Sequence, residues 1–263
     1  MNVQLSANIQ ALILGKQGSG KSLLARCALA MEVVQDTRDF YVSISTKPDH
    51  YYVHAPARGP NLEISLEKLG FAHVPLSPET IPDATKFRLR PFFEHSSRLC
   101  LTIMGLSPEA RKDVMNAIAR DILETQSAVV LIDEADRLIP PQGKFVPDEF
   151  LNLIRQGRYK GINMWFISHS DTSIHHEVVE EANLIVAFCM LHPTRVERLR
   201  HVFTDPRMLT RLRRWEYLAH YQVSGEEWIG NSTYDLFQLW KIYPPAFVDS
   251  DGVYEYFAQT LKV

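Results

Sequence analysis

Residues 15–22 read G-K-Q-G-S-G-K-S, namely Gly15, Lys16, Gln17, Gly18, Ser19, Gly20, Lys21 and Ser22. This run fits the phosphate-binding pattern G-x-x-x-x-G-K-[ST], with a strand-like segment before it (Ile9–Leu14) and a helix-like segment after it (Lys21–Val34). A glycine-rich turn in that setting aims backbone N–H groups and a helix N-terminus at phosphate oxygens. We therefore expect a nucleotide site in which Lys21 reaches the β- and γ-phosphates and Ser22 binds Mg²⁺.

A second motif agrees with the first. Residues 128–134 read A-V-V-L-I-D-E, an apolar run followed by two carboxylates. Such a run is typical of a strand buried on both faces of a parallel sheet, and ligands bind at the carboxyl edge of these sheets. We expect Asp133 to hold Mg²⁺ and Glu134 to orient and deprotonate the water that attacks ATP, so the two motifs together predict an ATPase.

Strand-like and helix-like segments alternate along the chain. The predicted strands after the first are Phe40–Ser45, Phe71–Leu76, Arg98–Met104, Ala128–Glu134, Gly161–Ser168 and Leu184–Met190. The predicted helices after the first are Leu62–Leu69, one capped by Ser107 with Pro108 at its first position, Pro147–Gly157, Thr172–Glu181 and Pro193–Phe203. This order predicts an α/β fold with a mainly parallel sheet covered by helices on both faces.

The same pattern predicts one domain over residues 1–263. Its core is expected over about residues 7–205, with a β-rich C-terminal extension over about residues 206–263. Hydrophobic residues make up 46% of the chain, which is ample for a packed core. No segment approaches the length that spans a bilayer, and the N-terminus lacks a signal-peptide pattern. The cysteines are far apart in apolar surroundings, which indicates reduced thiols and a cytoplasmic protein.

One stretch resembles a particular family. Residues 153–170 read L-I-R-Q-G-R-Y-K-G-I-N-M-W-F-I-S-H-S. This resembles the FtsK–HerA superfamily of ring-forming DNA-pumping ATPases, in which an arginine-containing helix leads through G-[IV]-[NH] to a strand ending in a polar sensor. The resemblance implies a RecA-like P-loop NTPase core. The helicase barrel, the membrane spans and the winged helix of larger members have no counterpart, so the chain resembles the compact genome-packaging ATPases of double-stranded DNA viruses.

The resemblance also implies roles for further residues. An arginine from the adjacent subunit would complete each ATP site, and Arg155 and Arg158 are the candidates, with Arg195 and Arg198 in reserve. His169 stands where the family usually places a sensor glutamine, so it either contacts the γ-phosphate in the same way or marks an altered sensor. The implied cofactors are ATP and Mg²⁺. The implied partners are double-stranded DNA, further copies in a hexameric or pentameric ring, and a capsid portal or vertex protein.

Two basic segments are candidates for DNA contact. The loop after the D-E strand, Arg137–Val146, carries Arg137 and Lys144 beside prolines and a glycine that keep it out of a helix. Residues 193–214 hold seven arginines against Glu197 and Asp205. That second segment is either a surface for phosphates or for a neighbouring subunit's nucleotide, or a solvated helical face.

Two histidine groups have the residue types of a metal site but not a known ligand pattern. His50 and His54 are spaced like ligands on a helix, yet Pro48 and Pro56 argue against a helix there. The run His175-His176-Glu177 does not complete H-E-x-x-H. Neither group is predicted to bind a metal.

Three functions fit the sequence. The first is an ATP-driven double-stranded DNA translocase acting as a ring, most simply one that packages a viral genome. The second is a cellular HerA-like helicase or conjugation motor. The third is a P-loop ATPase that drives protein assembly rather than DNA movement. The overall charge of −3 excludes only a uniformly basic protein that coats nucleic acid.

Overall fold

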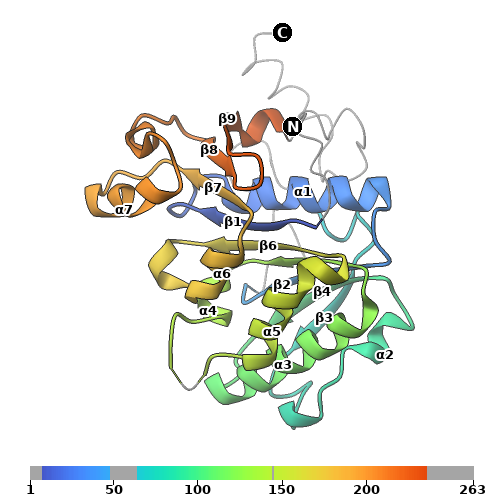
Figure 1. Cartoon of the computed structure of the whole chain (residues 1–263). Coiled ribbons are helices and arrows are strands. Elements are labelled where there is room, and N and C mark those ends of the chain that lie inside the picture. Colours follow the sequence, from blue (N-terminus) through green and yellow to red (C-terminus); the bar gives the residue numbers. More distant parts are fainter. Residues whose placement is uncertain (1–7, 48–63, 144, 236–263) are drawn as a thin grey trace, which may run out of the picture.

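The structure is a computed structural model that describes residues 8–47, 64–143 and 145–235. A nine-stranded sheet runs through the molecule in the order β3-β4-β2-β5-β6-β1-β7-β8-β9 (Figure 1). The strands from β3 to β7 are parallel, and β8 and β9 are antiparallel. The strand bounds are β1 Gln10–Leu14, β2 Phe40–Ser45, β3 Ala72–Leu76, β4 Arg98–Ile103, β5 Ala128–Ile132, β6 Ile162–Ser168, β7 Leu184–Phe188, β8 Glu216–Tyr221 and β9 Glu226–Asn231.

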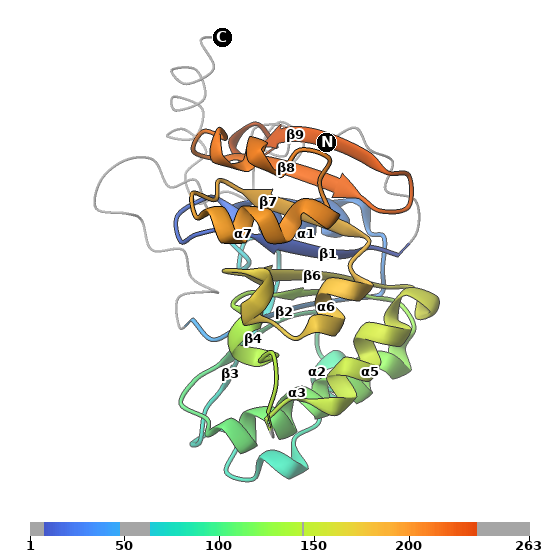
Figure 2. The same ribbon diagram turned by 60° about the vertical axis from the view of Figure 1, so that its left-hand side comes forward.

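Helices cover both faces of this sheet (Figure 2). The α-helices are α1 Lys21–Gln35, α2 Arg90–Phe93, α3 Pro108–Thr125, α4 Ala135–Leu138, α5 Asp148–Gly157, α6 His176–Glu181 and α7 Pro193–Arg198. The 3-10 helices are η1 Ala84–Lys86, η2 Arg158–Lys160, η3 Asp171–Ser173, η4 Leu199–His201 and η5 Pro206–Thr210. The predicted RecA-like arrangement of a mainly parallel sheet between helices is confirmed.

Side chains that point to alternate faces of the sheet belong to two separate hydrophobic cores. In β1, Leu12 and Leu14 join the core that α3, α5 and α6 cover, whereas Ala11 and Ile13 join the core beneath α1. Successive strand residues point to opposite faces, so a strand in the middle of the sheet needs apolar residues at every position. Every residue of β1 and β5 is accordingly buried.

The helix predictions succeed where caps or periodicity are strong. Ser107 accepts a hydrogen bond from the Ala110 N–H at 3.2 Å and caps α3, whose Val114, Ile118 and Ile122 are fully buried. The predicted helix over residues 62–69 is wrong for its described part, because residues 65–70 form turns and pack beneath α1. The predicted helix over residues 172–181 is interrupted, since η3 ends at Ser173 and α6 begins only at His176.

The C-terminal strands continue the sheet beyond β7. Strand β8 pairs with β7 from Tyr217 opposite Phe188 to Tyr221 opposite Leu184, and β9 closes that edge as a hairpin. Between β7 and β8 the chain leaves the sheet and returns to the same edge, through α7, η4 and η5 (Figure 2). Residues 236–263, the last part of the predicted β-rich extension, lie outside the described residues.

Candidate nucleotide-binding site

The two sequence motifs meet at one edge of the sheet. The register pairs Leu14 with Ser168 and Ile132 with Phe166, so β1, β5 and β6 end side by side. The glycine-rich loop follows β1, and Asp133 and Glu134 follow β5. Parallel strands that end together bring residues distant in sequence to the same edge, which is where open α/β sheets hold their ligands.

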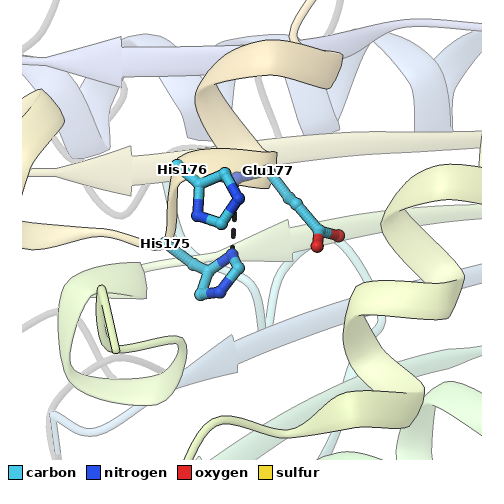
Figure 3. A group of neighbouring side chains, drawn as sticks. All are labelled: His175, His176 and Glu177. Carbon is cyan, nitrogen blue, oxygen red and sulfur yellow. Dashed lines mark hydrogen bonds between the residues drawn. The ribbon is translucent and has the colours of Figure 1, made fainter. Parts of the chain in front are cut away.

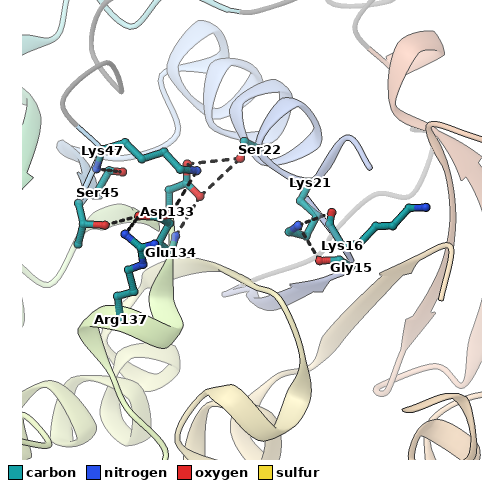
Figure 4. A network of polar contacts seen from close by, with 10 residues as sticks. Gly15, Lys16, Lys21, Ser22, Ser45, Lys47, Asp133, Glu134 and Arg137 are labelled. Atoms are coloured by element: carbon teal, nitrogen blue, oxygen red, sulfur yellow. Dashed lines mark hydrogen bonds and ion pairs between the residues drawn. The ribbon is translucent and has the colours of Figure 1, made fainter. Parts of the chain in front are cut away.

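The glycine-rich loop folds around its own lysine. Lys21 lies at the start of α1, is buried, and donates from Nζ to the carbonyls of Gly15 at 2.7 Å and Lys16 at 2.8 Å. Burial lowers the pKa of Lys21 to about 8, and the nearby negative charge of Asp133 opposes that shift. In Figure 4 the lysine lies apart from the acidic pair, turned onto the loop. The Lys21 ammonium therefore lies inside the glycine-rich loop.

One glycine of the loop is required by a close approach. Gly20 has φ 109°, a conformation that costs L-residues energy, and it precedes α1. A Cβ there would lie 2.7 Å from Ser232 Oγ and 2.8 Å from Trp215 Cε3. Both partners come from the C-terminal part of the chain, so any side chain at position 20 would push that part away from the loop.

Asp133 is the centre of a set of oxygen and nitrogen groups. It is 2% exposed, and its carboxylate oxygens lie 3.3 and 3.5 Å from Ser22 Oγ. The Lys47 ammonium lies 3.1 Å from Asp133 Oδ2 (Figure 4). A hydroxyl and a buried carboxylate are hard oxygen donors of the kind Mg²⁺ prefers when phosphates supply the remaining ligands. Ser22 and Asp133 therefore fit such an ion.

Glu134 has an unusual backbone conformation, and three side chains contact its carboxylate. Its φ of 54° and ψ of 45° are left-handed, which is uncommon for a residue other than glycine and is found often at functional sites. Thr46 donates to Oε2, the Arg137 guanidinium lies 3.3 Å from the same oxygen, and the Lys47 ammonium lies 4.0 Å from Oε1. These contacts fix the carboxylate beside Asp133 and offset its charge.

Thr46 and Lys47 were missed by the sequence reasoning. They directly follow β2, whose neighbour in the sheet is β5, and Asp133 donates its N–H to the carbonyl of Ile44 at 2.8 Å. The signal in the sequence was two polar residues at the end of the buried run F-Y-V-S-I-S. That signal has meaning only once β2 is known to lie beside β5.

The other predicted residues lie in different places. His169 follows β6 at the same edge and is exposed, while Ser168 before it is buried and donates to the Ser170 carbonyl at 2.9 Å. Arg155 lies in the last turn of α5. Arg158 begins η2, beside the amino end of β6 and therefore at the edge opposite the glycine-rich loop. Arg137 is 62% exposed and pairs with Glu134, and Lys144 lies outside the described residues.

Arg155 and Arg158 differ in their partners. Arg155 forms an ion pair with Glu177 of α6 and donates to Asn152 Oδ1 at 3.1 Å. The Arg158 side chain has no polar partner in the described part of the chain, although its carbonyl accepts from Asn8. Tyr159 beside it is 90% exposed. Arg158 is thus the freer of the two cations.

The run His175-His176-Glu177 gathers in space at the start of α6. Its ligand atoms lie within 4.8 Å of one another (Figure 3). The His175 and His176 rings lie 4.3 Å apart, and His175 Nδ1 accepts from the Glu177 N–H at 3.4 Å. The Glu177 carboxylate is paired with Arg155, whose positive charge would oppose a metal cation. His50 and His54 lie outside the described residues.

The fold and this edge define a P-loop ATPase. The AAA domain family matches residues 10–172, which is more than half of the chain and includes both motifs. The chain belongs to that family. A search of curated proteins gives no match. No helix in the described part of the chain is long and apolar enough to cross a membrane.

Solved structures share the fold at low sequence identity. The genome-packaging NTPase B204 of Sulfolobus turreted icosahedral virus 2, in complex with ATPγS, is 14% identical with a TM-score of 0.59, covering 86% of this chain and 97% of B204. VirB4 of Thermoanaerobacter pseudethanolicus is 12% identical with a TM-score of 0.59, covering 85% and 89% of the two chains. The pCW3 conjugation coupling protein TcpA with ATPγS is 14% identical with a TM-score of 0.50, covering 89% and 65%. These structures share the fold that the resemblance to compact packaging ATPases implied.

Proposed function

We propose that this protein is an ATP-driven double-stranded DNA translocase that works as a ring of identical copies and packages a viral genome. The observation that carries the proposal is the site itself, an acidic pair facing a phosphate loop, in a fold that spans nearly all of a viral genome-packaging NTPase. The chain would act as a single motor domain in the host cytoplasm, docked on a capsid portal or vertex protein.

Each residue of the site has a proposed role in ATP hydrolysis. Residues 15–22 bind the phosphates through their N–H groups, and Lys21 leaves its two carbonyl partners to meet the β- and γ-phosphates. Ser22 and Asp133 would hold Mg²⁺, which would neutralise charge on the phosphate oxygens. Glu134 accepts a proton from the attacking water, and His169 contacts the γ-phosphate. Arg158 of a neighbouring copy stabilises the charge of the transition state.

Lys47 gives this site a distinctive resting state. Its ammonium lies on Asp133 and near Glu134, so the acidic pair already has a cation before any metal arrives. The ammonium would therefore compete with a bound Mg²⁺ for Asp133. The side chain of Lys47 is 40% exposed, so solvent screens the pair and keeps its contribution small.

Lys47→Ala is expected to lower the Mg²⁺ concentration that gives half-maximal nucleotide binding by up to about fivefold, since a partly exposed ion pair contributes roughly 0.2–1 kcal/mol. The measurement is a Mg²⁺ titration of the binding of a fluorescent ATP analogue. Lys47→Arg is the matched control, because it keeps the charge and should titrate like the wild type. An identical Mg²⁺ dependence in Lys47→Ala would mean that the lysine does not compete with the metal.

The experiment that tests the proposed function is an ATPase assay with and without linear double-stranded DNA, with the mass of the assembly measured in parallel. DNA should stimulate hydrolysis, and the stimulated species should be a closed ring. A ring stimulated by DNA is also expected of a conjugation motor, which the likeness to VirB4 and TcpA favours as the second candidate. Packaging of DNA into empty capsids separates the two. An equal rate of ATP hydrolysis with and without DNA would favour an ATPase that drives protein assembly.

A further inference from the structure

The segment between β7 and β8 concentrates the positive charge of the molecule. Residues 193–214, here called the arginine arm, hold seven arginines against two acidic residues, a net charge of +5. The whole chain has a net charge of −3, so the remaining residues together carry −8. All seven arginines are exposed, namely Arg195, Arg198, Arg200, Arg207, Arg211, Arg213 and Arg214. A basic surface on an acidic protein attracts polyanions and leaves the rest of the molecule to repel them.

Most of these arginines are not used to hold the fold together. Arg200 pairs with Glu197 at 2.9 Å, and the Arg214 guanidinium lies 4.7 Å from the centre of the Trp215 ring. The other five have no polar side-chain partner in the described part of the chain. The second acidic residue, Asp205, accepts from the Arg207 backbone N–H and caps η5. Five guanidinium groups are therefore available to an outside ligand.

The arm is packed on the sheet rather than extended into solvent. Its apolar side chains join the core that covers β1 and β7, and the Met190 N–H donates to the Leu209 carbonyl at 3.1 Å. The buried residues are Val196, Leu199, Val202, Phe203, Leu209 and Leu212. Because the inner side of the arm is buried, its arginines are presented outward on a rigid support, which lowers the entropy lost when they bind.

The chain on either side of the arm packs against the glycine-rich loop. The strand before it ends at Phe188, whose Cβ lies 2.9 Å from the place of a Cβ on Gly15. The residue after it, Trp215, lies against Gly20 and accepts from the Ser232 N–H at 2.9 Å. A change in the loop on nucleotide binding would therefore reach Phe188 before the arm and Trp215 after it. Figure 2 shows the arm, with α7, beside β7 and β8.

We propose that the arginine arm binds the phosphate backbone of double-stranded DNA and is the main DNA-gripping surface of each subunit, an inference that rests on the proposed translocase function. Guanidinium groups match phosphate oxygens in pairs of hydrogen bonds and carry no preference for sequence by themselves. A motor that moves along DNA needs contacts of that kind. Residues 137–146, the other candidate for DNA contact, are less suited, because Arg137 lies in α4 rather than in the predicted loop and its guanidinium pairs with Glu134.

The test is the salt dependence of DNA binding by Arg207→Ala/Arg211→Ala/Arg213→Ala. Binding of a fluorescent 30-base-pair duplex is followed by anisotropy over a KCl series, with ATPγS present. Removing one phosphate contact should reduce the slope of log K against log salt by about 0.9, so the triple variant should be shallower by roughly 2–3, and should bind at least about tenfold more weakly at low salt. The matched control is Arg88→Ala/Arg90→Ala/Arg120→Ala, which removes three exposed arginines elsewhere and should behave like the wild type.

Two further measurements keep the outcomes separate. Arg207→Lys/Arg211→Lys/Arg213→Lys keeps the charges and should recover most of the slope, and an unchanged thermal unfolding midpoint shows that each variant is folded. If the alanine variant binds DNA as tightly as the wild type and with the same salt slope, the proposed DNA binding by the arm is wrong, but the proposed translocase function stands. If the wild type binds no DNA, both the DNA binding by the arm and the translocase function are wrong. If the arm variant and the control variant lose DNA affinity equally, the effect is one of overall charge, and the proposed DNA binding by the arm is wrong.

Discussion

Glu134→Gln is expected to bind ATP with near wild-type affinity and to hydrolyse it about 10²–10⁴-fold more slowly, the scale of a lost general base. The substitution keeps the shape of the side chain and can still accept from Thr46, so the left-handed turn that follows β5 should persist. It leaves Ser22 and Asp133 unchanged as oxygen donors. The measurements are ATP affinity by calorimetry and single-turnover hydrolysis.

Two other variants serve as controls for Glu134→Gln. Lys21→Ala should lose ATP binding as well as turnover, because the buried ammonium of the phosphate loop is removed. Glu124→Gln changes an exposed glutamate on α3 and should match the wild type. Full turnover by Glu134→Gln would exclude Glu134 as the base and leave its strained backbone without a catalytic explanation.

Arg158→Ala is expected to leave ATP binding nearly intact and to reduce hydrolysis by about two or more orders of magnitude, the scale of an arginine supplied in trans. The side chain lies at the amino end of β6, the edge opposite its own glycine-rich loop, so within one copy it is far from the phosphates. It acts only if a neighbouring copy presents that loop to it. Loss of hydrolysis with intact binding is measured on the assembled ring.

Arg155 is an equal candidate in the sequence, and the structure separates the two. Its ion pair with Glu177 occupies it within the subunit, so Arg155→Ala should lower the thermal unfolding midpoint modestly and have the smaller effect on hydrolysis. Mixing Arg158→Ala with Lys21→Ala should restore part of the activity, because each protein supplies the half of a shared site that the other lacks. If the mixture stays inactive and Arg158→Ala alone is fully active, the arginine lies elsewhere, with Arg195 and Arg198 next to be tested.

Much of the fold could be predicted because its signals are local. The strands over residues 40–45, 98–103 and 162–168 are almost entirely buried and rich in apolar residues, as strands in the middle of a parallel sheet must be. Helix α3 is indicated by the Ser107 cap and a four-residue apolar spacing. The segment over residues 64–69 also carries apolar residues, and Ser65 accepts from the Lys68 N–H at 3.2 Å as a helix cap would, yet it forms turns. Leu66 and Leu69 pack beneath α1, so packing rather than propensity decides its shape.

The sequence by itself determined the class of the protein. A phosphate loop and a D-E strand are contiguous motifs whose chemistry depends on the order of residues along the chain, so both can be recognised from that order alone. Only the tertiary structure decided what surrounds them. Thr46 and Lys47 reach Glu134 and Asp133 because β2 lies beside β5, and Trp215 reaches Gly20 because β8 continues the sheet past β7. Contacts between residues distant in sequence leave no periodic trace, and it is these contacts that set the resting charge of the site and tie the arginine arm to the phosphate loop.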